Sequence, residues 1–109
     1  MLGLGANGHL GFNEPAETLR PGPHVAELSE SSLGHAMVQG HAANIRYGLT
    51  LGMADILRAR CIILLVNGRH KHRPMQRLFA TDISTCFPAS FLYLHPDVTC
   101  FCDREAMSG

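Results

Sequence analysis

The segment CIILLV at residues 61–66 is the longest apolar run in the chain. It is far too short to span a membrane, which takes about 20 apolar residues. It has no polar position and is rich in β-branched side chains, as is typical of a strand buried on both faces. Such strands occur almost only in parallel sheets that helices cover on both sides. The run therefore predicts an α/β fold.

The segments around this run alternate between strand and helix patterns. Helical apolar spacing and a proline suited to a first turn indicate the helices, and short apolar stretches bounded by turn residues indicate the strands. We expect strands or extended segments at residues 1–5, 24–28, 46–51 and 98–103, and helices at 29–39, 51–59, 70–80 and 88–94. This order favours a three-layer α/β/α arrangement with a largely parallel, Rossmann-like sheet. A chain of 109 residues holds one domain, and because residues 1–5 look like the end of a strand, we expect it to be incomplete at its N-terminal side.

The net charge and the cysteine pattern limit which binding partners and which cellular compartment are expected. The formal net charge is zero, which argues against a nucleic-acid partner, and we expect no membrane partner because no long apolar segment is present. Without a signal-peptide pattern, the expected location is the cytoplasm. The four cysteines, at positions 61, 86, 100 and 102, lack Cys-x-x-Cys spacing, so we expect reduced, buried thiols and no metal site.

The chain opens on a glycine-dense segment, LGLGANGHLGFNEP at residues 2–15. Glycines let a backbone turn tightly and approach a ligand closely. Gly3, Gly5 and Gly8 also match the dinucleotide-binding fingerprint, which requires the third glycine to lie in a helix that packs on the sheet. Pro15 argues against such a helix. Dinucleotide binding is therefore a minor alternative for this loop.

His9 and Glu14 are the titratable groups of this segment, and Asn7 is placed to orient the imidazole ring. A carboxylate beside an imidazole fixes its tautomer and raises its basicity, as a general acid/base requires. Ligand sites in α/β proteins lie where parallel strands end, which is where we expect this loop. The alternative is that His9 only satisfies a turn carbonyl and that Glu14 is solvated.

A second candidate site is the basic cluster NGRHKHR at residues 67–73, between the strongest strand and a predicted helix. Cations are unfavourable at the N-terminus of a helix unless an anion binds there, which motivates a phosphate hypothesis. The alternative is an exposed basic patch that is only solvated. Contact with nucleic acid is a poor third interpretation, since no aromatic residues are interleaved.

Taken together, these residues suggest a family. Residues 2–15 closely resemble the active-site signature of the glucosamine/galactosamine-6-phosphate isomerases (deaminases). Collinear matches follow at YGLTLG (47–52), DILRA (55–59), IILLVNG (62–68) with Lys71, PASFLYLH (88–95) and CD (102–103). The likeness spans nearly all of residues 1–109 and covers the C-terminal half of the family's domain. Asn7 and the PASFL segment look closest to the bacterial galactosamine-6-phosphate branch.

The resemblance implies conversion of a 2-amino-2-deoxy sugar 6-phosphate into a ketose 6-phosphate with release of ammonia, without a metal or organic cofactor. It implies that His9 opens the sugar ring, that Glu14 supports the ring and relays its proton, and that Asn7 orients it. Lys71 matches the family's phosphate-contacting lysine. Many members carry Asp at position 7, and a family arginine expected near positions 37–38 is absent, which leaves Arg46 as a substitute.

The resemblance also places the family's proton-abstracting aspartate and its first phosphate loop in the N-terminal half, upstream of these residues. We therefore expect an enzyme fragment whose partners are a small-molecule sugar phosphate and either the missing N-terminal half or another copy of the chain. Two alternatives stay open: a non-catalytic sugar-phosphate-binding or interaction fragment, and a hydrolase like 6-phosphogluconolactonase. The FNEP segment at residues 12–15 argues against the hydrolase, because it resembles the amino-sugar branch.

Overall fold

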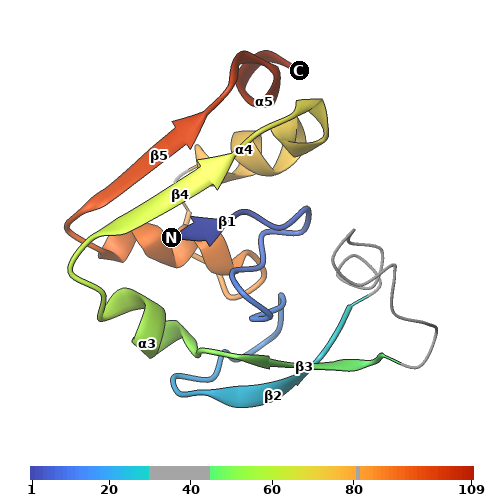
Figure 1. Ribbon diagram of the computed structural model, residues 1–109, viewed down its shortest axis with the longest axis vertical. Helices are drawn as coiled ribbons and strands as arrows, with labels where there is room; N and C mark the ends of the chain where they lie inside the picture. The colour runs from blue at the N-terminus through green and yellow to red at the C-terminus, as the bar shows by residue number, and fades with distance from the viewer. Residues whose placement is uncertain (30–44, 81) are drawn as a thin grey trace.

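The computed structural model describes residues 1–29, 45–80 and 82–109. Within these residues the main sheet holds three parallel strands in the order β1-β4-β5, and a separate antiparallel pair joins β2 to β3. Figure 1 shows the main sheet in the upper part of the view and the pair along the bottom. The strands are β1 (Leu2–Gly3), β2 (His24–Glu27), β3 (Tyr47–Thr50), β4 (Ile62–Val66) and β5 (Val98–Cys102).

Short helices lie between the strands and after the last one. They are α3 (Met53–Leu57), the 3-10 turn η1 (Arg69–Lys71), α4 (His72–Leu78), the 3-10 helix η2 (Pro88–Leu94) and α5 (Arg104–Ser108). Asp103 caps α5, since its carboxylate accepts a hydrogen bond from the backbone N–H of Ala106 at 2.8 Å. The same carboxylate accepts from the backbone N–H of Gly68 at 3.0 and 3.1 Å. Asp103 thereby ties the segment after β5 to the turn after β4.

The core lies on one face of the main sheet. Side chains alternate between the faces of a strand, and in β4 this alternation buries Ile62, Leu64 and Val66. The helices supply the other side of the core, with these buried residues: Met53 and Ile56 of α3, Met75 and Leu78 of α4, Ala89 and Leu92 of η2, and Ala106 of α5. Because the sheet is parallel, the chain leaves β1 and β4 at the same edge. The glycine-dense loop and the basic cluster both start there.

The opposite face of the sheet is open to solvent. Ile63 and Leu65 of β4 are 37% and 44% exposed, and Phe101 of β5 is 57% exposed. The prediction that residues 61–66 are buried on both faces is therefore wrong for this chain, because no described helix covers the second face. The predicted burial of the cysteines is wrong as well. All four are free and exposed, and two of them lie on β5, an edge strand of the described sheet.

The largely parallel α/β sheet is confirmed, and each predicted strand is present within a shorter range. Two features were not predicted. The segments at 24–28 and 46–51 pair with each other rather than with the main sheet, and the five-residue helix α5 is too short to leave a periodic pattern. The helix expected at 29–39 lies outside the described residues, apart from Ser29. Across the described ranges no helix is long and apolar enough to cross a lipid bilayer.

Candidate functional site

The loop after β1 folds back on itself in a tight turn. The backbone N–H of Gly8 donates to the carbonyl of Gly5 at 2.9 Å, and the N–H of Gly5 donates to the carbonyl of His9 at 3.0 Å. A Cβ atom at position 5 would lie 2.2 Å from Nδ1 of His9. Glycine at this position therefore lets the imidazole ring lie directly against the backbone.

The three predicted site residues of this loop lie together. Asn7 is the link, because its Oδ1 lies 2.7 Å from Nδ1 of His9 and its Nδ2 donates to Oε2 of Glu14 at 3.0 Å. The backbone N–H of His9 also donates to Asn7 Oδ1, at 3.2 Å. The Glu14 carboxylate lies 3.7 Å from His9 Nδ1, and both side chains are largely buried, at 13% and 14% exposure. We call this arrangement of Asn7, His9 and Glu14 the histidine trio.

The trio determines which imidazole nitrogen is protonated. An amide oxygen only accepts hydrogen bonds, so His9 Nδ1 must be the donor in its contact with Asn7. In the neutral ring the lone pair then belongs to Nε2, which is the nitrogen that can accept a proton from a substrate. When it does so, the nearby carboxylate of Glu14 stabilises the resulting imidazolium. The arrangement can therefore move a proton to and from a bound hydroxyl group.

Phe87 supports the loop from the other side and was not predicted as part of the site. Gly8 has φ = 91°, and a Cβ there would lie 2.2 Å from the Phe87 ring. The backbone N–H of Ala89 donates to the Gly8 carbonyl at 2.9 Å, and the Arg77 guanidinium lies 4.4 Å from the centroid of the Phe87 ring. No sequence motif marks Phe87, because its role depends on a contact between segments far apart in the chain.

Lys71 lies at the same edge of the sheet. Its Nζ donates to the carbonyl of Leu4, the first residue after β1, at 2.6 Å. Partial burial lowers the pKa of Lys71 below its ordinary value, because desolvation disfavours the ammonium form. An anion beside the ammonium would offset that cost. Arg69, His70 and Arg73 of the same cluster are exposed, in agreement with the solvated-patch interpretation for these three.

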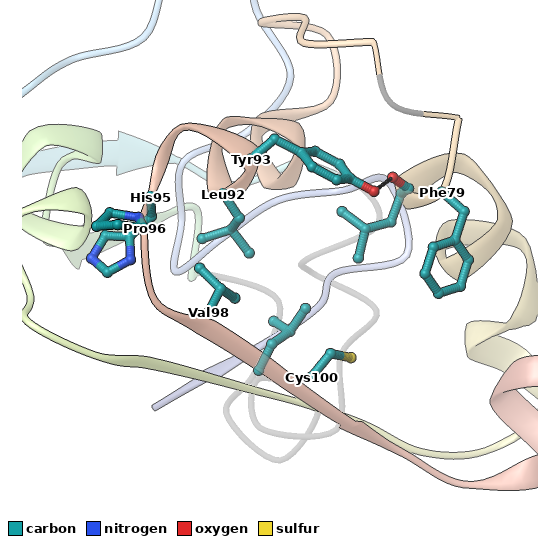
Figure 2. Close-up of a pocket in the computed structure, with 9 residues that line it drawn as sticks. Phe79, Leu92, Tyr93, His95, Pro96, Val98 and Cys100 are labelled. Atoms are coloured by element: carbon teal, nitrogen blue, oxygen red, sulfur yellow. Dashed lines mark hydrogen bonds between the residues drawn. The ribbon is translucent and has the colours of Figure 1, made fainter.

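Besides a cavity of about 460 Å³ along the β2–β3 pair, lined by residues 23–25 and 49–51, the described residues line two further cavities. One of about 370 Å³ is bounded by the 12–20 loop and the β2–β3 pair, and Glu14 is among its lining residues. The other, of about 300 Å³, is apolar and lies between η2, α4 and the main sheet (Figure 2). There the Tyr93 hydroxyl donates to the Leu78 carbonyl at 2.5 Å, and Leu92, Val98 and Cys100 line the wall. Of the histidine trio, Glu14 lines the cavity of about 370 Å³, whereas Asn7 and His9 are not among its lining residues.

In the part of the chain that the structure describes, no three His, Cys, Asp or Glu side chains lie close enough together to hold a metal ion. Of the dispersed histidines, His35 and His41 lie outside the described residues, as do positions 37–38.

Comparison with known proteins places the chain beside sugar-phosphate enzymes. No protein-family model matches it. It is 44% identical over 100 residues to the Escherichia coli (strain K12) protein named "Putative deaminase AgaI", covering 92% of this chain and 40% of that protein. A solved monomeric glucosamine-6-phosphate deaminase of the NagB superfamily superposes with a TM-score of 0.87 at 39% identity, covering 98% of this chain and 45% of that one.

A more distant solved structure shares the fold. The 6-phosphogluconolactonase of Trypanosoma cruzi gives a TM-score of 0.69 at 25% identity, covering 96% of this chain and 38% of that enzyme. In every one of these comparisons the chain spans less than half the length of the protein that it matches.

Proposed function

We propose, on the premise that this chain is a relative of the glucosamine-6-phosphate deaminases in sequence and fold, that it carries the ring-opening half of an amino-sugar 6-phosphate isomerase/deaminase. The complete reaction would convert a 2-amino-2-deoxy sugar 6-phosphate into a ketose 6-phosphate and ammonia. The observation that carries the proposal is the contact of Asn7 with both His9 and Glu14.

Ring opening of a cyclic sugar requires one proton to leave the anomeric hydroxyl and another to reach the ring oxygen. His9 is suited to both transfers, because Nδ1 donates to Asn7 and Nε2 carries the lone pair, so Nε2 takes the hydroxyl proton and then gives it to the ring oxygen. We assign it the role of acid/base. Asn7 orients the ring, and Glu14 stabilises the charge that forms on it. An amide stabilises an imidazolium less than a carboxylate would, so Glu14 is the main source of electrostatic support.

Lys71 is the proposed phosphate ligand. An ammonium has three N–H donors, and among the described residues one of them is used, in the bond to the Leu4 carbonyl. A phosphate bound at the strand edge would be attracted to its charge. Lys71 is also the only lysine of the chain, so the signal of a lysine side chain reports on this residue alone.

The first experiment isolates ring opening from the later steps. Two-dimensional NMR exchange spectroscopy measures how fast the α and β anomers of glucosamine 6-phosphate and galactosamine 6-phosphate interconvert, which requires only ring opening and closure. We expect the chain to accelerate the exchange and His9→Gln to abolish the acceleration, whereas the matched control His95→Gln should retain it. An exchange rate equal to that of the buffer would contradict the proposal.

The second experiment tests phosphate binding. In a protein labelled with 13C-lysine, the single Lys71 signal should titrate with a pKa below 10.5, and saturating sugar phosphate should raise that pKa because an anion favours the ammonium form. A titration curve that does not change with either sugar phosphate would show that Lys71 does not bind the phosphate.

A lactonase is the second candidate, favoured by the fold match to the trypanosomal 6-phosphogluconolactonase. A histidine base could activate water against a lactone carbonyl by the same proton transfer. Hydrolysis of 6-phosphogluconolactone above the spontaneous rate, with no effect on amino-sugar anomers, would favour this candidate.

A further inference from the structure

One face of the main sheet is apolar and uncovered by the described residues. The register aligns Leu65 with Phe101, and strand alternation places Ile63 on the same face. We call these three residues the open face. A Cβ added to Gly3, which pairs with Leu65 in β1, would meet nothing within 4 Å. None of the described residues therefore packs directly over Gly3, and neither β4 nor β5 carries a charged residue.

An apolar face of a parallel sheet is expected to be covered by other segments. Parallel sheets are nearly always buried on both sides, and the all-apolar sequence of β4 fits that environment. Other large apolar side chains of this protein are exposed too, for example Leu49 on β3 at 80%. That residue belongs to an antiparallel pair, and one face of an antiparallel sheet commonly meets water. The open face is unusual by comparison, because it is an uncovered face of a parallel sheet.

The structural comparison indicates what covers it. The matched deaminase is monomeric, so whatever lies over the equivalent strands must come from its own chain. This chain matches only 45% of that deaminase, yet 98% of this chain is used in the match. Apart from the counterpart of residues 30–44, which the structure does not describe, the covering segment must therefore belong to the part of the deaminase that this chain does not match.

We infer that the open face is a docking surface for a polypeptide with the sequence and fold of the other half of a glucosamine-6-phosphate deaminase. The occupant packs an apolar helix surface on Ile63, Leu65 and Phe101. It either precedes these residues in one longer chain or is supplied as a separate chain. This inference rests on the same relationship as the proposed function, but its test measures association and not activity.

The probe is the segment of the monomeric deaminase that precedes the matched region, produced as a separate polypeptide. Mixed with this chain, it should give a one-to-one complex in size-exclusion chromatography with light scattering. Leu65→Lys and Phe101→Glu should each weaken the affinity by about tenfold or more, because each places a charge in an apolar contact. The matched control Leu49→Lys introduces the same charge on the β2–β3 pair and should change the affinity by less than about twofold.

Three outcomes would overturn the inference. The first is the absence of a complex when circular dichroism shows that both polypeptides are folded. The second is equal weakening by Leu65→Lys and Leu49→Lys, which would place the contact elsewhere. The third is a dimer of this chain that Leu65→Lys dissociates and that the probe does not displace, which would assign the face to a second copy. A complex without anomer exchange would support docking and contradict the proposed function, so the two failures are distinguishable.

Discussion

Asn7 connects the two titratable groups of the candidate site, since one amide contacts both His9 and Glu14. Removing that amide in Asn7→Ala should free the imidazole to adopt the other tautomer. We expect the anomer exchange rate to fall by about tenfold or more, as is typical when an acid/base loses its orientation. Gln76→Ala removes an exposed amide on α4 and serves as the control for stability and rate.

Asn7→Asp provides a sharper test, because it changes the charge and keeps the shape. A carboxylate at this position favours the imidazolium, so the pKa of His9 should be higher in the variant than in the parent chain. The neutral base then predominates only at higher pH, so the acidic limb of the pH–rate profile should shift to higher pH. An unchanged limb would show that His9 is not the titrating base.

Cys100 should be a slow nucleophile although it lies on an edge strand. Although Cys100 as a whole residue is exposed, its thiol is partly buried, which raises the thiol pKa, and the neighbouring Cys102 raises it further. Because only the thiolate reacts with iodoacetamide, peptide mapping at pH 8 should show slower alkylation at Cys100 than at the exposed loop residue Cys86. Cys102→Ser should speed the reaction at Cys100, and urea should remove the difference between the two sites. Equal rates in the folded protein would contradict this expectation.

Site residues whose contacts are local in the sequence could be predicted, whereas those that act through distant contacts could not. His9, Asn7 and Glu14 lie within one glycine-dense segment, so the sequence alone brings them near one another. Phe87 and Leu4 act through contacts across the fold, with Gly8 and with Lys71, and no spacing rule marks either residue. The roles assigned to His9 and Lys71 remain predictions.

At the scale of elements, Lys71 is the bridge between β1 and the turn after β4. Its ammonium is bonded to the Leu4 carbonyl, and partial burial lowers its pKa below the ordinary value of 10.5. The unfolded chain therefore binds more protons than the folded chain between the lowered pKa and 10.5, so this residue makes stability rise with pH across that window. Lys71→Met should remove this rise and cost about 1 kcal/mol near neutral pH through the lost hydrogen bond.

Urea denaturation of the parent chain and of Lys71→Met at several pH values measures both quantities. Arg73→Met, at an exposed position of α4, controls for the loss of a positive charge. If the stability of both variants depended on pH in the same way, Lys71 would not be the source of the rise.

Elements with a strong sequence pattern were predicted correctly. Burial and strand pairing, which depend on the other segments of the fold, were not. The apolar run at 61–66 gave β4 within one residue, and Pro88 correctly began η2. That run could not show that Ile63 and Leu65 are exposed here, because burial depends on which segments are present to cover a face. Pairing of β2 with β3 was also hidden, since residues 24–28 and 46–51 are far apart in sequence and no short turn connects them.

At the scale of the whole molecule, the chain has one covered and one open sheet face and spans less than half the length of its relatives. Joining it to the part of such a relative that it does not match should therefore produce a complete active site. We predict that a chimaera, in which this chain replaces the matched region of the monomeric glucosamine-6-phosphate deaminase, releases ammonia from glucosamine 6-phosphate or galactosamine 6-phosphate. Its melting temperature should exceed that of this chain alone, because the open face is then buried.

The chimaera is assayed by enzyme-coupled detection of ammonia. His9→Gln should lower the rate by about a hundredfold or more, the range in which loss of a general acid/base falls. Leu65→Lys should instead lower the melting temperature, because it acts on packing and not on proton transfer. A folded chimaera that is inactive with both sugars would contradict the proposed chemistry. If His9→Gln left full activity, some other group would have to open the ring, and the geometry of the histidine trio would have no catalytic consequence.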